Sequence, residues 1–229
     1  MIVLAGGRSS RMGRDKAWLP VGERPALLHV VEAGLRAGVE RIVVVGTSGQ
    51  PLPPLPAGVE RRDDPTDRRH QGPLSGLEAG LGALAAQAVE VACLASCDAL
   101  WLDAAHVRFV LGLLDRDDRE DDREDDRERS DERECSAVVP ASEPDEDGRV
   151  VLHPLCGAVR VQPAWRAAQG LLREGQRAAR ALFGALEART IAVASLPQPR
   201  VVEACNTPEP WAQAVAELAA RAGQPPAVE

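Results

Sequence analysis

Residues 1–20 read MIVLAGGRSSRMGRDKAWLP, an apolar strand that runs into a basic loop containing glycine. Gly6 and Gly7 remove side chains where a backbone can approach an anion closely. Four basic side chains can add positive charge there: Arg8, Arg11, Arg14 and Lys16. The spacing is neither that of a Walker A loop nor the GxGxxG of a dinucleotide fold. The stretch therefore predicts a loop for a phosphate-rich ligand, with an ordinary glycine-rich turn and solvated arginines as the alternative.

Outward from this stretch, short β-rich runs alternate with helical patterns. The predicted strands are residues 1–5, 41–46, 89–96, 136–141 and 190–195, with a further β-rich run at 150–161. The predicted helices are residues 25–38, 74–88, 103–114, 163–174 and 176–186, and a last helix opened by NTPEPW at 206–211. Asn206 or Thr207 can cap that last helix. This alternation predicts a three-layer α/β/α, Rossmann-like domain with a mostly parallel sheet.

The composition is that of a globular protein, and we expect residues 1–229 to form one domain. The net charge of −8 is concentrated in the tract 115–134, whose thirteen acids and six arginines carry −7. The rest of the chain therefore predicts no binding to nucleic acid or to membranes. We expect this charged, low-complexity tract to be a disordered insertion rather than a specific acidic site, with a solvated helix as the alternative.

Features of targeting and of cysteine chemistry are absent from the sequence pattern. It has no apolar run long enough for a membrane span and no secretory signal, so we expect a cytoplasmic protein. Its five cysteines form no CxxC pair, and we expect them to be reduced packing residues. His153 lies near Cys156 in sequence, but nothing further supports a nucleophilic cysteine.

The stretch LAGGRSSRMGRDKAWLPVG at 4–22 resembles the signature of nucleotidyltransferases, and most of all that of molybdenum cofactor guanylyltransferases. Three later stretches agree in order: GPLSGL at 72–77, HPLCGAV at 153–159 and NTPE at 206–209. The resemblance implies a nucleotidyltransferase fold in which the main chain of Leu4, Ala5, Gly6 and Gly7 cradles GTP. It also implies that Arg11 and Lys16 neutralise the triphosphate.

The same resemblance implies two carboxylates at the site. Relatives carry a nucleotide-contacting aspartate shortly before GPL, which leaves Asp63 and Asp64 both eligible, and we favour Asp63. Asp98 follows an apolar strand and is the candidate ligand for Mg²⁺, which prefers oxygen ligands and bridges to phosphates. The family usually has proline where this chain has Leu100, and an Asp at the end of a strand is otherwise often a cap for the following helix.

The implied reaction is transfer of GMP from GTP to the terminal phosphate of molybdenum-molybdopterin, with release of pyrophosphate. The implied cofactor is Mg²⁺, and the implied partners are GTP, molybdenum-molybdopterin, and molybdoenzymes or their chaperones. The alternatives are a related transferase that uses CTP or a phosphosugar, and a nucleotide-binding protein without activity. Gly46 stands where some relatives have an Asn that bears on base recognition. His153 is open to two interpretations, a contact to the pterin phosphate or a structural role.

Overall fold

A seven-stranded sheet forms the centre of the protein in the computed structural model, which describes residues 1–6, 14–64, 72–120 and 135–222. The strand order is β5-β4-β1-β6-β8-β7-β9. The strands are β1 (Ile2–Leu4), β4 (Ile42–Thr47), β5 (Val59–Asp64), β6 (Val91–Ser96), β7 (Ala137–Ala141), β8 (Ala158–Arg160) and β9 (Arg189–Ala192).

The sheet is mostly parallel, as the alternation of strands and helices predicts. β1 pairs in parallel with β4 and β6, β4 with β5, and β7 with β9. β8 runs antiparallel to both of its neighbours, β6 and β7. The carboxyl ends of β5, β4, β1 and β6 therefore meet at one edge of the sheet, where ligands bind in folds of this class.

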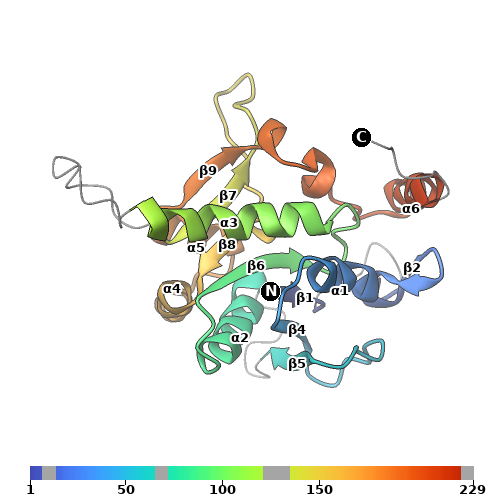
Figure 1. Cartoon of the computed structure of the whole chain (residues 1–229), viewed down its shortest axis with the longest axis horizontal. Coiled ribbons are helices and arrows are strands. Elements are labelled where there is room, and N and C mark those ends of the chain that lie inside the picture. The colour runs from blue at the N-terminus through green and yellow to red at the C-terminus, as the bar shows by residue number, and fades with distance from the viewer. Residues whose placement is uncertain (7–13, 65–71, 121–134, 223–229) are drawn as a thin grey trace.

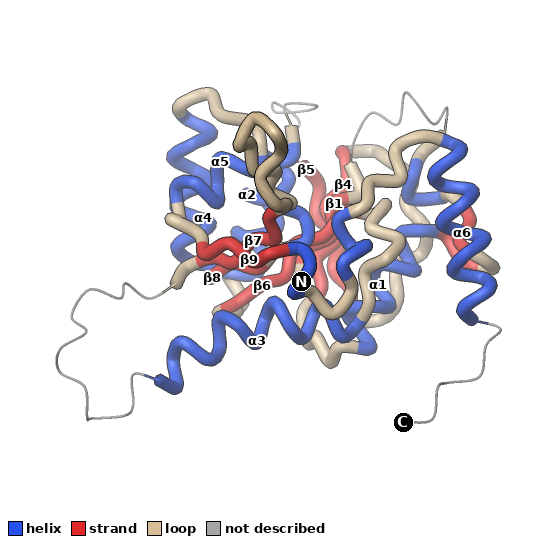
Figure 2. Tube along the Cα trace, turned by 90° about the horizontal axis from the view of Figure 1, so that it is seen from above, coloured by secondary structure: helices blue, strands red, loops and turns tan. Residues whose placement is uncertain are grey.

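Helices cover both faces of the sheet, and Figure 2 shows the strands lying between them. The first layer holds α1 (Ala26–Arg36) and α3 (Ala104–Glu120), and the second holds α2 (Pro73–Ala85), α4 (Val161–Arg173) and α5 (Ala179–Ala185). Side chains of β1 alternate between the layers: Val3 packs in the core beneath α1 and α3, whereas Ile2 and Leu4 pack beneath α2. The three-layer prediction is thus confirmed.

A third apolar cluster attaches the C-terminal part of the chain. Helix α6 (Pro208–Ala222) packs near the small hairpin of β2 (Pro20–Val21) and β3 (Arg24–Pro25), on the right of Figure 1. The cluster comprises Leu19, Val21, Ala26, Leu100, Trp101, Cys205, Trp211 and Ala214. It brings a segment from the end of the chain against the loop that follows β6.

Three elements differ from the sequence prediction. The segment of β5, which reads VERRDD, was not predicted as a strand because it lacks an apolar run, yet it pairs with β4 as an edge strand. The β-rich run 150–161 contains only the short β8, preceded by the 3₁₀ helix η3 (Pro154–Cys156). Helix α3 continues to Glu120, so the first residues of the acidic tract are helical. Residues 121–134, the remainder of that tract, lie outside the described residues.

Helix length also bears on the membrane question. None of the helices in the four described ranges is long and apolar enough to cross a membrane.

Candidate active site

A cavity of about 610 Å³ opens at the carboxyl ends of β1, β4 and β6. This volume lies within the range of small-molecule pockets. It is lined by Leu4, Ala5, Gly6, Lys16, Val45, Gly46, Thr47, Asp64, Gly72, Pro73, Gly76, Ser96, Cys97, Asp98, Ala99, Leu152, His153, Pro154, Leu155, Cys156, Val201, Val202, Glu203, Ala204 and Asn206. The cavity thus joins the first strand of the chain to segments near its end.

The end of β1 and the start of α2 form one side of the cavity. The N–H groups of Ala5 and Gly6 donate to the Val45 carbonyl, at 2.8 and 3.2 Å, and so continue the pairing of β1 with β4. A Cβ on Gly6 would lie 3.2 Å from the Thr47 hydroxyl oxygen, so glycine permits this close approach. Helix α2 begins beside this strand end, and a helix N-terminus favours phosphate. Its first residue, Pro73, has no N–H and the Leu74 N–H donates to the Arg177 carbonyl at 3.2 Å, so any phosphate contact would come from residues after Leu74.

Lys16 and Asp98 meet at the centre of the cavity wall. The Lys16 ammonium lies 2.5 Å from Asp98 Oδ2 and 2.5 Å from Asn206 Oδ1. Both charged side chains are only 16% exposed, and the Ser96 hydroxyl donates to the other carboxylate oxygen of Asp98. The arrangement places a cation and an anion in contact at the same point of the cavity, which suits a ligand that carries phosphates together with a metal ion.

Asp15 and Gln50 hold Lys16 in this position. The Asp15 carboxylate accepts from the Ala17 N–H at 3.0 Å and caps the 3₁₀ helix η1 (Lys16–Trp18). The Gln50 side-chain amide donates to the other Asp15 oxygen at 2.6 Å and to the Ala5 carbonyl at 3.1 Å. It also accepts from the Thr47 N–H at 2.9 Å. Gln50 thereby joins the ends of β1 and β4 to the loop of Lys16, a role that no local pattern indicates.

Asp98 lies in the turn after β6 and does not cap the helix that follows, α3. The N-cap of α3 is Asp103, whose carboxylate accepts from the His106 N–H at 2.8 Å. The capping alternative for Asp98 is therefore wrong. Leu100 is 1% exposed, and its N–H donates to the Asp98 carbonyl at 2.9 Å, a bond that a proline at this position does not make. With Leu100 in place of the proline usual in the family, the turn gains this hydrogen bond, and Asp98 still faces the cavity.

The structure distinguishes the two aspartates at the end of β5. Asp64 lines the cavity, and its carboxylate accepts from the Ser75 hydroxyl at 2.5 Å. Asp63 does not line the cavity; its carboxylate lies 3.0 Å from Arg61 Nε and its side chain is 41% exposed. Successive side chains of a strand point to opposite faces, which explains the difference. The sequence favoured Asp63 as the nucleotide contact, whereas of the two aspartates Asp64 is the one that lines the cavity.

Of the other predicted site residues, Leu4, Ala5 and Gly6 line the cavity together with Lys16 and Asp98. Gly7 and Arg11 lie outside the described residues. Asn206, which the sequence offered as a helix cap and as part of the NTPE stretch shared with the family, contacts Lys16. Ser96, a polar residue at the end of an apolar strand, was not among the predicted site residues, although its place beside Asp98 is a signal in the sequence.

The cavity wall also contains His153, Cys97 and Cys156. Burial lowers the pKa of His153, and burial raises the pKa of Cys156 to about 12. Burial likewise raises the pKa of Cys97. All five cysteines are free thiols. Because a thiolate is the nucleophilic form, these shifts favour a packing role for the cysteines at the cavity.

The comparisons with known proteins agree with this architecture. The family model described as the MobA-like NTP transferase domain matches residues 1–191. The chain belongs to this family. The match covers β1 to β9 and includes Lys16, Asp64 and Asp98, whereas Asn206 and α6 lie beyond it.

Curated relatives of this MobA-like NTP transferase match over part of their length. A "Probable molybdenum cofactor guanylyltransferase" of Mycobacterium avium (strain 104) is 43% identical over 99 residues, which cover 42% of this chain and 48% of the relative. A protein of the same name from Mycobacterium tuberculosis (strain ATCC 25618 / H37Rv) is 39% identical over 102 residues, covering 44% and 49%. The chain thus spans about half the length of the curated relatives it matches.

Solved structures share the fold of the MobA-like NTP transferase over nearly the whole chain. The molybdopterin-guanine dinucleotide biosynthesis protein A of Archaeoglobus fulgidus has a TM-score of 0.66 at 15% identity, covering 96% of this chain and 98% of that one. The 2-C-methyl-D-erythritol 4-phosphate cytidylyltransferase of Thermus thermophilus has a TM-score of 0.64 at 18% identity, covering 95% and 98%. The nucleotidyltransferase fold is thus confirmed.

The donor set of this MobA-like NTP transferase fits Mg²⁺. Among the described residues, no group of three or more His, Cys, Asp or Glu side chains could hold a metal ion alone. Mg²⁺ is usually bound by one or two carboxylates together with substrate phosphates and waters, rather than by a cage of protein ligands. The Asp98 carboxylate faces the cavity and would be one hard oxygen ligand of this kind, in exchange for its contacts to Ser96 and Lys16.

Proposed function

We propose that this chain transfers GMP from GTP to the terminal phosphate of molybdenum-molybdopterin, releases pyrophosphate and forms the molybdopterin guanine dinucleotide cofactor. The observation that carries the proposal is the convergence of Lys16, Asp98 and Asn206 at the cavity where β1 ends. The names of the curated relatives support GTP and molybdopterin as the substrates.

In the proposed reaction, an oxygen of the acceptor phosphate attacks the α-phosphorus of GTP. The bond from the α-phosphorus to the bridging oxygen breaks, and pyrophosphate leaves with the electron pair. The acceptor phosphate is already a nucleophile, so no covalent enzyme intermediate is required. The protein's contribution is to align the two phosphates and to neutralise charge on them.

The side chains of the cavity have separate roles in this proposal. The backbone of Leu4 to Gly6 and the start of α2 receive the nucleotide, and Lys16 lies on its phosphates. Asp64, held by Ser75, contacts the nucleotide from the end of β5. Asp98 would hold Mg²⁺, which would supply charge neutralisation for the triphosphate and the leaving pyrophosphate. Lys16 and Asp98 then exchange their mutual ion pair for contacts to the ligand.

A related transferase that uses CTP is the second candidate, because the fold is shared almost equally with a cytidylyltransferase, that of Thermus thermophilus. Its TM-score of 0.64 is close to the 0.66 of the Archaeoglobus fulgidus protein, so the fold does not discriminate between bases. Gly46 at the cavity presents no side chain to a base edge. A nucleotide-binding protein without activity is the third candidate.

One set of measurements separates the three candidates. Binding of GTP, CTP and ATP is measured by calorimetry with and without Mg²⁺, and pyrophosphate release is then measured with molybdenum-molybdopterin as the acceptor. We expect selective binding of GTP and pyrophosphate release that needs both the acceptor and Mg²⁺. Release with CTP alone would favour the second candidate, and binding without release from any acceptor would favour the third.

A further inference from the structure

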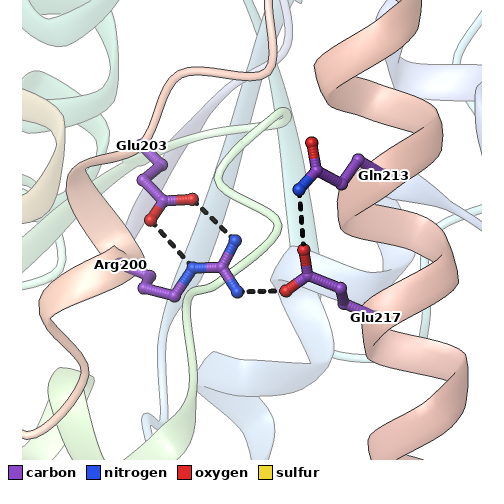
Figure 3. A network of polar contacts seen from close by, with 4 residues as sticks. All are labelled: Arg200, Glu203, Gln213 and Glu217. Carbon is purple, nitrogen blue, oxygen red and sulfur yellow. Dashed lines mark hydrogen bonds and ion pairs between the residues drawn. The ribbon is translucent and has the colours of Figure 1, made fainter.

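Arg200 lies at the centre of a polar network near the end of the chain (Figure 3). It belongs to the 3₁₀ helix η5 (Pro199–Val202), and its guanidinium donates to both carboxylate oxygens of Glu203, at 2.8 and 3.0 Å. Its remaining nitrogen donates to Glu217 on α6, whose other oxygen accepts from Gln213 at 3.2 Å. One guanidinium thus ties η5 to α6 across the intervening segment.

The same guanidinium also stacks on Trp101, with its central carbon 3.6 Å from the ring centroid. Trp101 is 2% exposed and belongs to the turn that follows Asp98. Within the part of the chain that the structure describes, the Trp101 indole N–H has no hydrogen-bond partner. The ring is therefore held by apolar packing and by two arginines, Arg200 and, farther away, Arg221 of α6, whose central carbon lies 5.0 Å from the ring centroid. Arg200 is the nearer of the two, and stacking on an aromatic face is a contact that arginine favours over lysine.

The segment between these fixed points forms part of the cavity wall. Glu203, Ala204 and Asn206 line the cavity, and Asn206 accepts from the Lys16 ammonium. Glu203 is fixed at one end of this segment by Arg200, and α6 is fixed beyond the other end through Glu217. The network therefore has the geometry to determine where Asn206 meets Lys16.

We propose that Arg200 is a positioning residue that holds the wall segment 203–206 against the Lys16–Asp98 pair. The proposal rests on the proposed function only for its effect on turnover, because the position of the wall is measurable without any substrate. Arg200 itself does not line the cavity. It acts through Asn206 on the phosphate-binding lysine, and through Trp101 on the turn that carries Asp98.

Two features support positioning over simple stabilisation. The Arg200 side chain is 30% exposed and that of Glu217 is 36% exposed, so these ion pairs contribute little to the free energy of unfolding. The hydrogen bond from Arg200 lowers the pKa of Glu217, so this carboxylate keeps its charge, and its pairing with Arg200, to a lower pH than an isolated glutamate. The planar guanidinium of Arg200, which contacts Glu203, Glu217 and Trp101, therefore fixes their relative positions more than it adds to the free energy of unfolding.

The first test measures hydrogen–deuterium exchange without substrate in the wild type, Arg200→Ala, Arg200→Lys and Glu217→Gln. We expect faster exchange in peptides covering residues 199–207 for Arg200→Ala and an intermediate increase for Arg200→Lys, with exchange of β1 and β6 unchanged. Arg24→Ala is the matched control, because Arg24 also pairs with a glutamate, Glu32, and neither residue lines the cavity. Unchanged exchange at 199–207 in Arg200→Ala would overturn the proposal. If Arg200→Ala unfolds globally, Arg200→Lys and Glu217→Gln decide instead, and unchanged exchange at 199–207 in both overturns it.

The second test measures GTP binding and turnover in the same variants. We expect Arg200→Ala to lower kcat by on the order of 10- to 100-fold, because small misplacements of aligned groups cost that much. GTP affinity and thermal stability should change far less, and Arg200→Lys should recover part of kcat. Equal kcat values for Arg200→Ala and Arg24→Ala would contradict the proposal. If the wild type has no activity with any acceptor, the proposed function fails, and the exchange measurement alone decides the role of Arg200.

Discussion

Lys16 and Asp98 form an ion pair in the protein. Binding of the proposed ligand must break this ion pair. Phosphate competes for the ammonium of Lys16, and Mg²⁺ competes for the carboxylate of Asp98. Each residue thus prevents the other from remaining an uncompensated buried charge while the cavity holds no nucleotide. This exchange makes the two residues separable by mutation, because each is needed for a different part of the ligand.

Lys16→Ala is expected to reduce turnover far more than it reduces stability. Removal of a charge-stabilising donor at an active site typically costs about 10²- to 10³-fold in kcat. The measurement is pyrophosphate release, with thermal unfolding alongside it. Arg24→Ala is the control, because Arg24 pairs with Glu32 and neither residue lines the cavity. Turnover of Lys16→Ala equal to that of the wild type would remove Lys16 from the site.

Asp98→Asn keeps the shape of the side chain and removes the charge that balances a metal ion. Since Asp103 caps α3, no capping role of Asp98 can account for a loss. We expect turnover to collapse while the protein stays folded, with a higher Mg²⁺ concentration needed for any residual activity. Pyrophosphate release is titrated against Mg²⁺ for both proteins. An Asn variant with the Mg²⁺ dependence of the wild type would show that Asp98 holds no metal.

Asp64→Ala and Asp63→Ala form a matched pair that tests the end of β5. Asp64 lines the cavity and accepts from Ser75, whereas Asp63 pairs with Arg61 outside it. We expect weaker nucleotide binding for Asp64→Ala and little change for Asp63→Ala, because exposed ion pairs contribute at most about 1 kcal/mol. Calorimetry with GTP measures both. The reverse order of affinities would restore Asp63 as the contact.

At the scale of elements, the start of α2 requires an unusual backbone conformation at the residue that precedes the helix. Gly72 precedes the helix with φ +103°, and a Cβ there would lie 2.5 Å from the Arg177 carbonyl oxygen. Farther along α2, a Cβ on Gly80 would lie 2.8 Å from Ile2 Cγ2, so glycine also allows the helix to pack closely on β1. The glycines of residues 72–80 therefore both allow α2 to pack closely on β1 and place the start of the helix at the cavity.

Gly72→Ala is expected to destabilise the protein by about 1–3 kcal/mol, the cost of a strained backbone, and to weaken nucleotide binding at the start of α2. Gly170→Ala in α4 is the control, because its φ is not positive and an added Cβ meets nothing within 4 Å. We expect that control to be neutral or slightly stabilising. Thermal unfolding measures both, and equal unfolding temperatures for the two variants would contradict the steric argument.

At the scale of the whole molecule, the charged tract 115–134 begins within the last turns of α3 and precedes β7 in the chain. Leu114 in α3 is fully buried, whereas Asp115, the first residue of the tract, is exposed. Arg160 and Arg189 donate to the carbonyls of Leu114 and Leu113, at 3.0 Å each. These two hydrogen bonds hold α3 at Leu113 and Leu114, just before the tract begins.

Deletion of residues 115–134, with a short Gly/Ser loop in their place, is expected to leave folding and turnover largely intact. The entropy of loop closure depends only on the logarithm of loop length. Leu114→Ala is the comparison, since loss of a buried leucine typically costs about 2–5 kcal/mol. Urea unfolding measures both. Loss of cooperative unfolding in the deletion variant would mean that the tract packs on the body.

Local patterns account for much of the fold and for part of the candidate site. The helices α1, α2 and α4 and the strands β1, β4, β6 and β7 follow from apolar patterns, because those residues pack against the sheet or within it. The start of α6 follows instead from the capping signal NTPEPW. The strand β5 follows from no such pattern, because an edge strand of charged residues is stabilised by pairing with β4 rather than by its own apolar side chains. Because β5 was not predicted as a strand, the sequence could not show which of Asp63 and Asp64 faces the cavity.

Lys16 and Asp98 were recognisable from their motifs, one after a glycine loop and the other after an apolar strand. Their contact joins positions 82 residues apart, and the contact of Lys16 with Asn206 joins positions 190 residues apart. Gln50, Ser96 and Arg200 likewise act through partners from other elements. A linear pattern encodes which segments become strands and helices, since that depends on neighbours in the chain. Which side chains then meet depends on the order and register of the strands, and these arise only when the whole sheet assembles.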